Sequence, residues 1–459
     1  MSSLSFSRPT AIRLLDRLCL VTALLCPIFL VHGRGIAEAM IDITAAGFLL
    51  RSAVGNDWLW LRTRWVQVAL FWWGWLVMCS LPVGPFGIGG WPGFGQALAT
   101  VRFLVFAAAL QHVALAEPRG RRLMRGLLVA ACLYIAAQLL LQAVTGYNLF
   151  GDPRFHDGTL TGPYDKPRAS APLSRLLLPV MLVASVWIAG RAGSAKRSSR
   201  WWLLAVSVLP LLAGLALMVL AGQRMPLLLV LLGLVVSGLV LRRLRLPLLA
   251  ALVAAPVLVA ISAFVSPRSF GHLVVLFSTQ MHDFPNSPYG LIYNRALAIA
   301  IANPLTGLGF DGFRNGCSLP AYFQDWPPWS PNNGDGGGAA ICVQHAHNHA
   351  LQALTDSGLI GLALFWAMVV AWLVALGRGL SRGQGGVQQA WRVGLFAAVF
   401  IHEWPIASAS AFTNMPLGGW FFLLLGTGLA EASGIVRRPV QTAAAAYIQP
   451  NMDSEKQDG

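Results

Sequence analysis

Apolar runs of about twenty residues recur along the whole chain, and they constrain its fold more than any other feature. The 459-residue sequence is 56% hydrophobic and only 11% charged, whereas soluble domains carry about 25% charged residues. Only helices and closed barrels satisfy the backbone hydrogen bonds in lipid, and the short-period alternation of a barrel is absent. The sequence therefore predicts an all-α membrane protein.

The apolar runs predict about twelve transmembrane helices. Basic residues gather on every second connecting segment, which places those segments and the N-terminus in the cytoplasm. The net charge of +15 thus follows from membrane topology, and no nucleic-acid partner is expected. The predicted spans are residues 14–32, 35–53, 65–83, 96–117, 124–146, 171–190, 201–221, 225–242, 246–265, 350–376, 389–409 and 415–434.

These spans divide the chain into four parts. Residues 1–265 contain about nine of the predicted transmembrane helices, and residues 350–438 contain the remaining helices, about three. Between them, residues 266–349 form a long periplasmic loop. A loop of this length is usually functional or folded, so we expect short helices in it. Residues 439–459 are polar and predict a disordered cytoplasmic tail.

Two of the six cysteines, Cys317 and Cys342, lie in the predicted outer loop. An oxidising compartment permits a disulfide between them, but their spacing does not require one. The other four lie in predicted spans and fit a role as small apolar fillers: Cys19, Cys26, Cys79 and Cys132.

Several arginines lie on the predicted outer side or inside a span, although basic residues usually collect on cytoplasmic segments. A charge within a span costs about 2.5–3.5 kcal/mol on insertion scales, so such residues are functional candidates. The planar guanidinium fits phosphate oxygens, which predicts a phosphorylated lipid ligand. The candidates are Arg102, Arg168, Arg175, Arg224 and Arg295.

Simpler interpretations of three of these arginines stay open. Arg168 also fits a solvated loop charge, and Arg175 fits a side chain that reaches the phospholipid headgroups. Arg102 fits an internal ion pair with Glu38 or Asp42. Arg224 is the sharpest candidate, because it occupies a tight outer turn between two very apolar runs.

The stretch Gln344–His349 brings three histidines to the point where the outer loop meets a predicted span. Zinc binding is one interpretation, since imidazole suits zinc, but no cysteine pair or paired carboxylate lies at ligand spacing nearby. Ordinary solvated loop histidines are another. We favour a general base, because neutral imidazole accepts a proton near pH 7. His347 is the predicted base and His349 a substrate contact.

The residues from His347 onward resemble a family signature. His347-Asn348, nine residues and then Gly358-Leu359-Ile360-Gly361 resemble the motif of O-antigen ligases and the related O-antigen polymerases. Gly222-Gln223-Arg224 resembles the first arginine position of this family. Tyr293-Asn294-Arg295, followed by Asn303-Pro304 and a glycine-rich turn, is similar to its outer-loop helix with a second arginine. The resemblance covers about residues 205–430.

The resemblance implies an inverting glycosyltransferase of the bacterial inner membrane, with its active site facing the periplasm. The donor would be a glycan on undecaprenyl pyrophosphate and the acceptor lipid A-core, with no metal and no other cofactor. His347 would deprotonate the acceptor hydroxyl. Arg224 and Arg295 would hold the pyrophosphate and stabilise the charge on the leaving group.

Secondary roles follow from the same resemblance. Asn348 would orient the acceptor or cap the following helix. Asp356 would pair with an arginine, orient the histidine or serve as a buried structural partner. Arg102, Arg168, Arg175 and His349 complete the predicted substrate-binding set.

Two other functions remain open from the sequence. A polymerase of the same family would join repeat units while the chain stays on the carrier lipid. A transporter of lipid-linked glycan would use the outer arginines to handle an anionic lipid, but transporters tend to show paired broken helices and repeat symmetry. The gathering of polar groups at one face favours an enzyme, and we predict the ligase.

Overall fold

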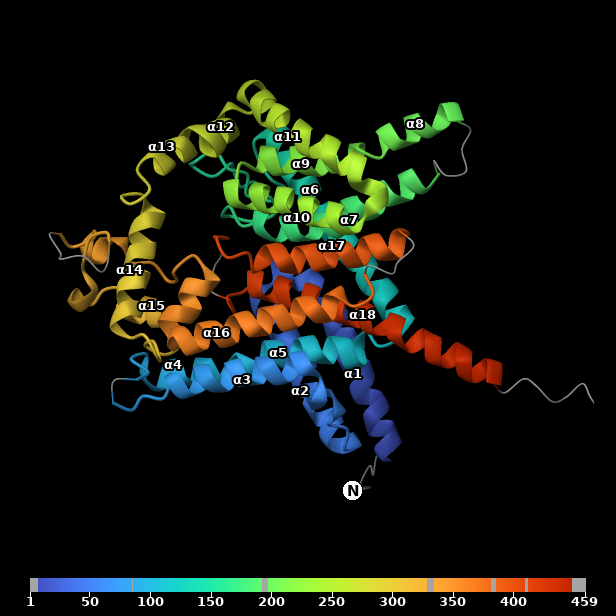
Figure 1. Cartoon of the computed structure of the whole chain (residues 1–459), viewed down its shortest axis with the longest axis horizontal. Helices are drawn as coiled ribbons and strands as arrows, with labels where there is room; N and C mark the ends of the chain where they lie inside the picture. Colours follow the sequence, from blue (N-terminus) through green and yellow to red (C-terminus); the bar gives the residue numbers. More distant parts are fainter. Residues whose placement is uncertain are drawn as a thin grey trace, which may run out of the picture.

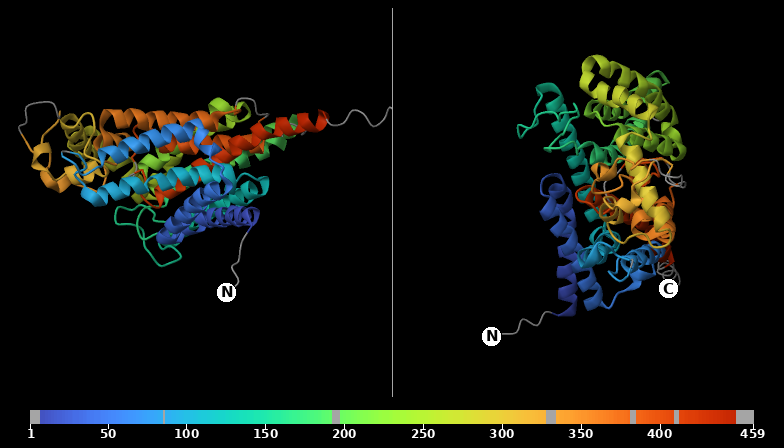
Figure 2. Two further views of the ribbon diagram at one scale, coloured as in Figure 1. Left: turned by 90° about the horizontal axis from the view of Figure 1, so that it is seen from below. Right: turned by 90° about the vertical axis from the view of Figure 1, so that its left-hand side faces the viewer.

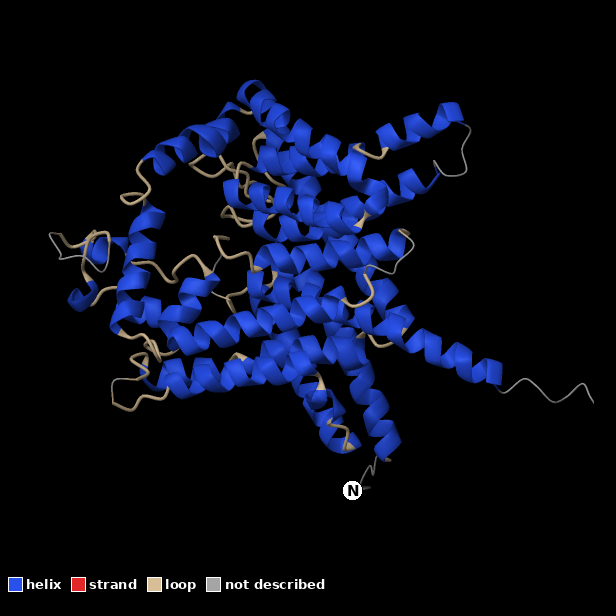
Figure 3. Ribbon diagram, viewed as in Figure 1, coloured by secondary structure: helices blue, strands red, loops and turns tan. Residues whose placement is uncertain are grey.

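The computed structural model describes residues 7–84, 86–191, 197–327, 334–380, 385–408 and 412–447. Figure 3 shows helices and loops but no strand in this part of the chain. One isolated antiparallel bridge pairs Tyr147 with Pro153. The all-α prediction is thus confirmed for the residues that the structure describes.

The helices before the long outer loop follow the predicted spans closely. They are α1 (Arg8–His32), α2 (Arg34–Gly55), α3 (Arg64–Cys79), α4 (Gly90–Ala99), α5 (Val101–Ala109), α6 (Pro118–Thr145), α7 (Ser170–Arg191), α8 (Arg197–Val206), α9 (Leu209–Ala221), α10 (Arg224–Val240) and α11 (Arg245–Val265). Short 3₁₀ or π segments join some of them: η1 (Leu59–Arg62), η2 (Leu110–Ala114) and η3 (Arg242–Leu244).

The segment between α11 and α16 contains the expected short helices. They are α12 (Pro267–Phe270), η4 (Gly271–Val275), α13 (Leu276–His282), α14 (Pro288–Ala302), α15 (Gly312–Gly316), η5 (Pro320–Tyr322) and η6 (Gly338–Ile341). Three long helices follow: α16 (His349–Gly377), α17 (Val387–His402) and α18 (Leu417–Tyr447).

Seven helical stretches among the described residues are long and apolar enough to cross a membrane. They are Arg8–His32, Gly90–Ala114, Pro118–Thr145, Ser170–Arg191, Trp201–Ala221, Arg242–Val265 and His349–Gly377. Helices α3, α10 and α17 are shorter than a usual span, and α2 carries four charged side chains along its length. Each predicted span overlaps a helix, and the number twelve stays a prediction.

The long helices run side by side in one body (Figure 1). Helix α16 packs against α3, and α17 packs against α7 and α10. Helices α12 to α15 gather at one end of this body, and the last turns of α18 project from the other. In the left view of Figure 2, α1, α2 and the loop between α6 and α7 lie on one side of the body. The short outer helices therefore cover one end of the bundle.

Helix α18 is longer than the sequence indicated. It continues to Tyr447, past residue 438, where we expected a disordered tail to begin. The added turns contain Ala443–Ala446, and alanine has the highest helix propensity. Residues 448–459 lie outside the described part of the chain.

Helix α16 is broken at Gly358, and the break brings two sequence motifs together. Gly358 has φ 65°, and a β-carbon there would lie 2.3 Å from the carbonyl carbon of Leu305. The Leu308 amide donates to the Thr355 carbonyl at 2.8 Å, a group that the broken helix leaves unpaired. The proline–glycine turn thus packs into the kink, and Gly358 is a close-packing site.

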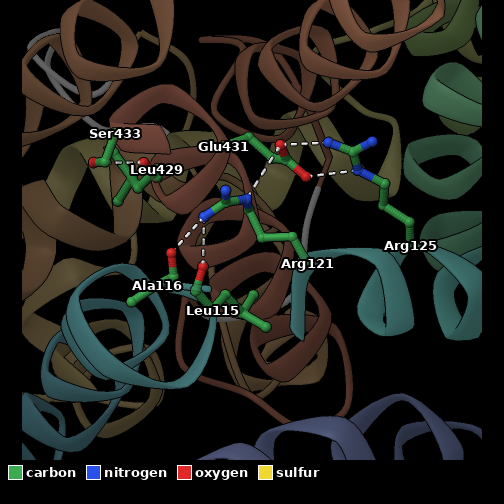
Figure 4. Close-up of polar contacts among 7 residues, drawn as sticks. All are labelled: Leu115, Ala116, Arg121, Arg125, Leu429, Glu431 and Ser433. Atoms are coloured by element: carbon green, nitrogen blue, oxygen red, sulfur yellow. Dashed lines mark hydrogen bonds and ion pairs between the residues drawn. The ribbon is translucent and has the colours of Figure 1, made fainter. Parts of the chain in front are cut away.

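At the end of the bundle away from the short outer helices, a buried carboxylate joins α18 to α6. Glu431 accepts hydrogen bonds from Arg125 Nε at 2.7 Å and Arg125 Nη2 at 2.5 Å (Figure 4). Arg121 Nε lies 3.9 Å from the same carboxylate. Arg121 also donates to the carbonyls of Leu115 and Ala116 at 3.0 and 2.7 Å. Every charge in this cluster thus has a partner, and the cluster fastens helices together.

Candidate functional site

The end of the bundle covered by the short outer helices contains a cavity of about 1710 Å³. Its walls come from α2, α4, α5, α10 and α13, the loop between α6 and α7, and the segments before α16 and α18. Its charged and imidazole side chains are Arg34, Glu38, Arg102, Asp157, Arg168, Arg224, His272, Asp311, Arg314, His345 and His347. The cavity is therefore mainly cationic, which suits an anionic ligand.

His347 faces this cavity from the strained end of the outer loop. Its backbone has φ 53°, in the left-handed region that few non-glycine residues adopt. The ring centroid lies 5.6 Å from that of Tyr289 and 4.5 Å from that of His345. Burial lowers the pKa of His347, so its imidazole is neutral near pH 7 and can accept a proton.

The pKa of His345 is also lowered. Burial lowers its pKa to about 4, helped by the positive potential of His347 and His349. Its ring shares the cavity wall with His347. His345 therefore adds a polar but uncharged surface at neutral pH.

Arg224 faces the same cavity from the first turn of α10. Gly222 ends α9 at φ 78° and allows the chain to turn sharply before Arg224. Arg224 Nη1 donates to Gln280 Oε1 at 2.5 Å, and the guanidinium lies 5.8 Å from the centroid of the Phe277 ring. Its Nε is buried and has no hydrogen-bond partner among the described residues. Arg224 thus brings a positive charge to the cavity wall, with a neutral amide as its hydrogen-bond partner.

Two further predicted arginines line the cavity in different states. Arg168 is exposed. Arg102 is half-buried and donates to Glu38 and, at 3.3 Å, to Asp42 Oδ2. The internal ion pair that the sequence left open is therefore present, and much of the Arg102 charge is balanced.

Arg295 lies inside the unit formed by α14, α15, η5 and η6, which we call the outer-loop unit. Only 1% of its surface is exposed. Its Nη2 donates to the carbonyls of Asp335 and Gly338 at 3.1 and 3.0 Å, and its Nη1 donates to the carbonyl of Cys317. The guanidinium carbon lies 4.4 Å from the centroid of the Phe323 ring. Arg295 is not among the described residues that line the cavity.

The disulfide that the sequence left open is present. Cys317 is bonded to Cys342, and Cys317 also provides the carbonyl that Arg295 contacts. Ile292, Ile299 and Phe313 pack around this point in a small apolar core. The outer-loop helices thus form a folded unit of their own beside the cavity.

A second group of predicted residues lies behind the cavity wall. Arg175 Nε donates to His402 Nδ1 at 3.1 Å. Glu403 Oε2 lies 3.0 Å from His349 Nδ1, and its Oε1 lies 3.8 Å from His402 Nε2. All four side chains are buried. Neither Arg175 nor His349 lines the large cavity, although His349 lines a small pocket of about 30 Å³ beside it.

The ligand atoms of His349, His402 and Glu403 lie within 4.8 Å of one another, a spacing that would suit a metal ion. Their hydrogen bonds argue against one. A neutral His402 that accepts from Arg175 at Nδ1 carries its proton at Nε2, so that nitrogen has no lone pair for a metal. His349 uses Nδ1 for Glu403, and a second cation would face the charge of Arg175. The donor set fits two hydrogen-bonded pairs, Arg175 with His402 and His349 with Glu403.

Asn348 and Asp356 have structural partners. Asn348 Oδ1 accepts from the Leu351 amide at 3.0 Å, which makes it the N-cap of α16. Its Nδ2 donates to the Pro405 carbonyl at 2.6 Å. Asp356 Oδ1 accepts from the Gly312 amide at 2.7 Å and from Gln352 at 2.8 Å. The capping role is thus present, and Asp356 anchors the turn before α15.

The structure brings His347, Arg224, Arg102 and Arg168 to one cavity and leaves Arg175, Arg295, Asn348 and His349 outside its lining. Sequence reasoning missed His402 and Glu403. Their signal was available, because they form a titratable pair at the end of an apolar span, where charges are expected to be functional. It also missed Tyr289 and Gln280, which carry no sequence signal.

The fold and the cavity define a helical membrane protein with a cationic site under an outer-loop unit. Residues 209–366 match the family model described as O-antigen ligase. The chain therefore carries an O-antigen ligase family domain, and the resemblance seen in the sequence is confirmed. A search of curated proteins found no match. Members of this family are membrane glycosyltransferase-like enzymes of lipopolysaccharide biosynthesis that act on lipid-linked glycans.

Proposed function

We propose that the protein transfers a glycan from undecaprenyl pyrophosphate to a lipid A-core acceptor, with inversion at the anomeric carbon. One observation carries this proposal: a neutral histidine, His347, and an arginine whose hydrogen-bond partner is a neutral glutamine, Arg224, face the same cavity. An acid–base group beside a phosphate-binding group is what glycosyl transfer from a pyrophosphate requires.

The donor lipid fits the α10 wall of the cavity. Arg224 stands at the helix N-terminus, where backbone amides and the helix dipole also favour an anion. Below it on the same helix, Leu228, Leu229 and Leu232 line the cavity. A pyrophosphate at Arg224 would thus lie next to an apolar surface for its polyprenyl tail. Leu276 and Met281 of α13 supply the facing apolar side chains.

In the proposed reaction, the His347 imidazole takes the proton of the acceptor hydroxyl. The acceptor oxygen forms a bond to the anomeric carbon as the bond from that carbon to the pyrophosphate oxygen breaks. The leaving pyrophosphate keeps the bonding electron pair, and Arg224 stabilises its charge. Arg168 lies on the same wall and would add positive potential. Because arginines can supply this charge, the proposed reaction requires no metal.

The proposal includes a topology and a location. We propose about twelve spans, with the N-terminus in the cytoplasm and the cavity facing the periplasm, in the bacterial inner membrane. Residues 266–349 would then be the periplasmic loop between the helices of residues 1–265 and those of 350–438. The disulfide in this loop supports that side, because disulfides persist in oxidising compartments.

A polymerase of the same family is the alternative. It would use the same donor chemistry and differ only in the acceptor, and the cavity volume of about 1710 Å³ accommodates either. A transporter of lipid-linked glycan is disfavoured, because the polar groups gather under one outer-loop unit at one end of the bundle.

The test is transfer in vitro by purified protein, supplied with undecaprenyl-pyrophosphate glycan and lipid A-core, with and without EDTA. We expect transfer to lipid A-core that resists EDTA and is lost in His347→Ala. Arg13→Ala is the folding and handling control, because Arg13 is an exposed residue of α1 that is not among the cavity-lining residues. Longer glycans on the carrier with lipid A-core untouched would identify a polymerase. No transfer by wild type to either acceptor would overturn the enzyme proposal.

A further inference from the structure

Two hydrogen bonds fasten the segment that carries His347 to the end of α17. His349 Nδ1 lies 3.0 Å from Glu403 Oε2, and Asn348 Nδ2 donates to the Pro405 carbonyl at 2.6 Å. Both bonds involve buried side chains. They hold the two residues that directly follow His347 in the chain.

His347 needs such support. Its φ of 53° lies in the left-handed region that few non-glycine residues adopt, and such strain persists only where the surroundings fix it. The fixed points are Asn348 and His349 on one side and, on the other, the Ala346 amide, which donates to Gln352 Oε1 at 3.3 Å. The backbone on both sides of His347 is therefore held.

Glu403 is the charged member of this arrangement. It is 4% exposed and stands where α17 ends. A buried carboxylate is costly unless hydrogen bonds compensate. His349 supplies one, and the chain through His402 to Arg175 places a positive charge nearby. Glu403 is not among the cavity-lining residues, so it acts only through its neighbours.

We propose that Glu403 is a positioning residue for the transfer reaction, an inference that rests on the proposed function of His347. By accepting from His349 Nδ1, Glu403 holds the backbone after His347 so that the imidazole stays in the cavity beside Tyr289. The side-chain oxygen of Glu403 fixes the position of His347, and its negative charge contributes less. A glutamine at this position offers a carbonyl oxygen of the same reach and can therefore take over this role.

The test compares Glu403→Ala and Glu403→Gln in the transfer assay, with kcat and the KM for the donor measured separately. Glu403→Ala should lower kcat roughly 10- to 100-fold, because displacement of a reacting group by about 1 Å costs this much. The KM for the donor should not change, because Arg224 and its wall remain. Glu403→Gln should recover most of the lost kcat.

Glu431 provides a matched control. Its side chain is 0% exposed and that of Glu403 is 1% exposed. From Leu417, which lines the cavity, Glu431 is about 20 Å along α18 at about 1.5 Å per residue. Glu431→Ala should lower the melting temperature and leave the kcat of the folded protein unchanged. A general loss of packing would affect both variants alike.

Three outcomes decide against the inference. Equal loss of kcat in folded Glu403→Gln and Glu403→Ala would show that the charge, and not the position, matters. Wild-type kcat in Glu403→Ala, with His347→Ala inactive, would overturn this inference and leave the proposed function intact. If Glu403→Ala does not fold, Glu403→Asp replaces it: the shorter side chain should lower kcat, and an unchanged kcat would contradict the inference. Full activity in His347→Ala would instead overturn the proposed function.

Discussion

The Tyr289 ring lies edge-on to the His347 imidazole, with ring centroids 5.6 Å apart and planes at 76°. Tyr289 belongs to α14 of the outer-loop unit, and His347 precedes α16. The outer-loop unit therefore helps to cover the proposed base, and burial lowers the pKa of His347. This relationship connects the position of a short helix to the pH dependence of the reaction.

Activity should fall as the pH drops through the His347 pKa, because a general base works in its neutral form. Since burial lowers that pKa, the acidic limb of kcat/KM should lie below about pH 6.5, the unperturbed value. Tyr289→Ala admits water and should move the limb upward, and Tyr289→Phe, which keeps the ring, should not. A pH profile of the three proteins checks this. A wild-type limb above pH 6.5 would contradict it.

Arg224→Ala should lower kcat/KM for the lipid-linked glycan. The corresponding rise in activation free energy should be at least about 2–3 kcal/mol, because a preorganised hydrogen-bond donor to the leaving group is removed. Arg224→Lys should restore part of the activity, since it keeps the charge but not the fork. The melting temperature should stay unchanged, because the guanidinium is only half-buried. Gln280→Ala, which removes a neutral partner of Arg224, is the control. Near-normal turnover in Arg224→Ala would exclude this residue from the pyrophosphate site.

Arg295→Ala should behave differently from Arg224→Ala. It leaves three carbonyls, two of them in buried bonds, without their charged donor, and one such bond contributes about 1.5–3 kcal/mol. We therefore expect a lower melting temperature, faster proteolysis between residues 288 and 342, and reduced activity, all together. Thermal unfolding and limited proteolysis measure this. Lost turnover with unchanged stability would instead support Arg295 as a pyrophosphate ligand, the role that the family resemblance implies.

Removal of the Cys317–Cys342 disulfide should destabilise the outer-loop unit. The bond closes a loop across a separation of 25 residues. A cross-link of this length stabilises the folded state by about 3 kcal/mol. Replacement of both cysteines by alanine, or addition of a reductant, should lower the melting temperature and speed proteolysis of this segment. Cys132→Ala, at a free cysteine of α6, controls for the change in side chain. Identical melting curves with and without reductant would refute the prediction.

Much of the fold was predictable because it depends on local composition. Apolar runs specify helices in lipid wherever they occur, and each predicted span overlaps a helix. The tail boundary was wrong because polarity suggested disorder at residues 439–447, whereas the alanine-rich segment continues α18. The sequence also indicated His347, Arg224 and the capping residue Asn348, since motif spacing and misplaced charge are local signals.

The burial and partners of Arg295 and Glu403 were not predictable from the sequence, because they depend on contacts between distant segments. Arg295 and Arg224 look alike in sequence, yet one is enclosed by carbonyls of the outer-loop unit and the other faces the cavity. Glu403 meets His349 only because α17 ends beside the start of α16. Composition thus determined the helices and the class of protein. The packing of those helices decided which charges are free for chemistry. A buried charge is costly unless it is paired, so it binds the partner that the fold places beside it.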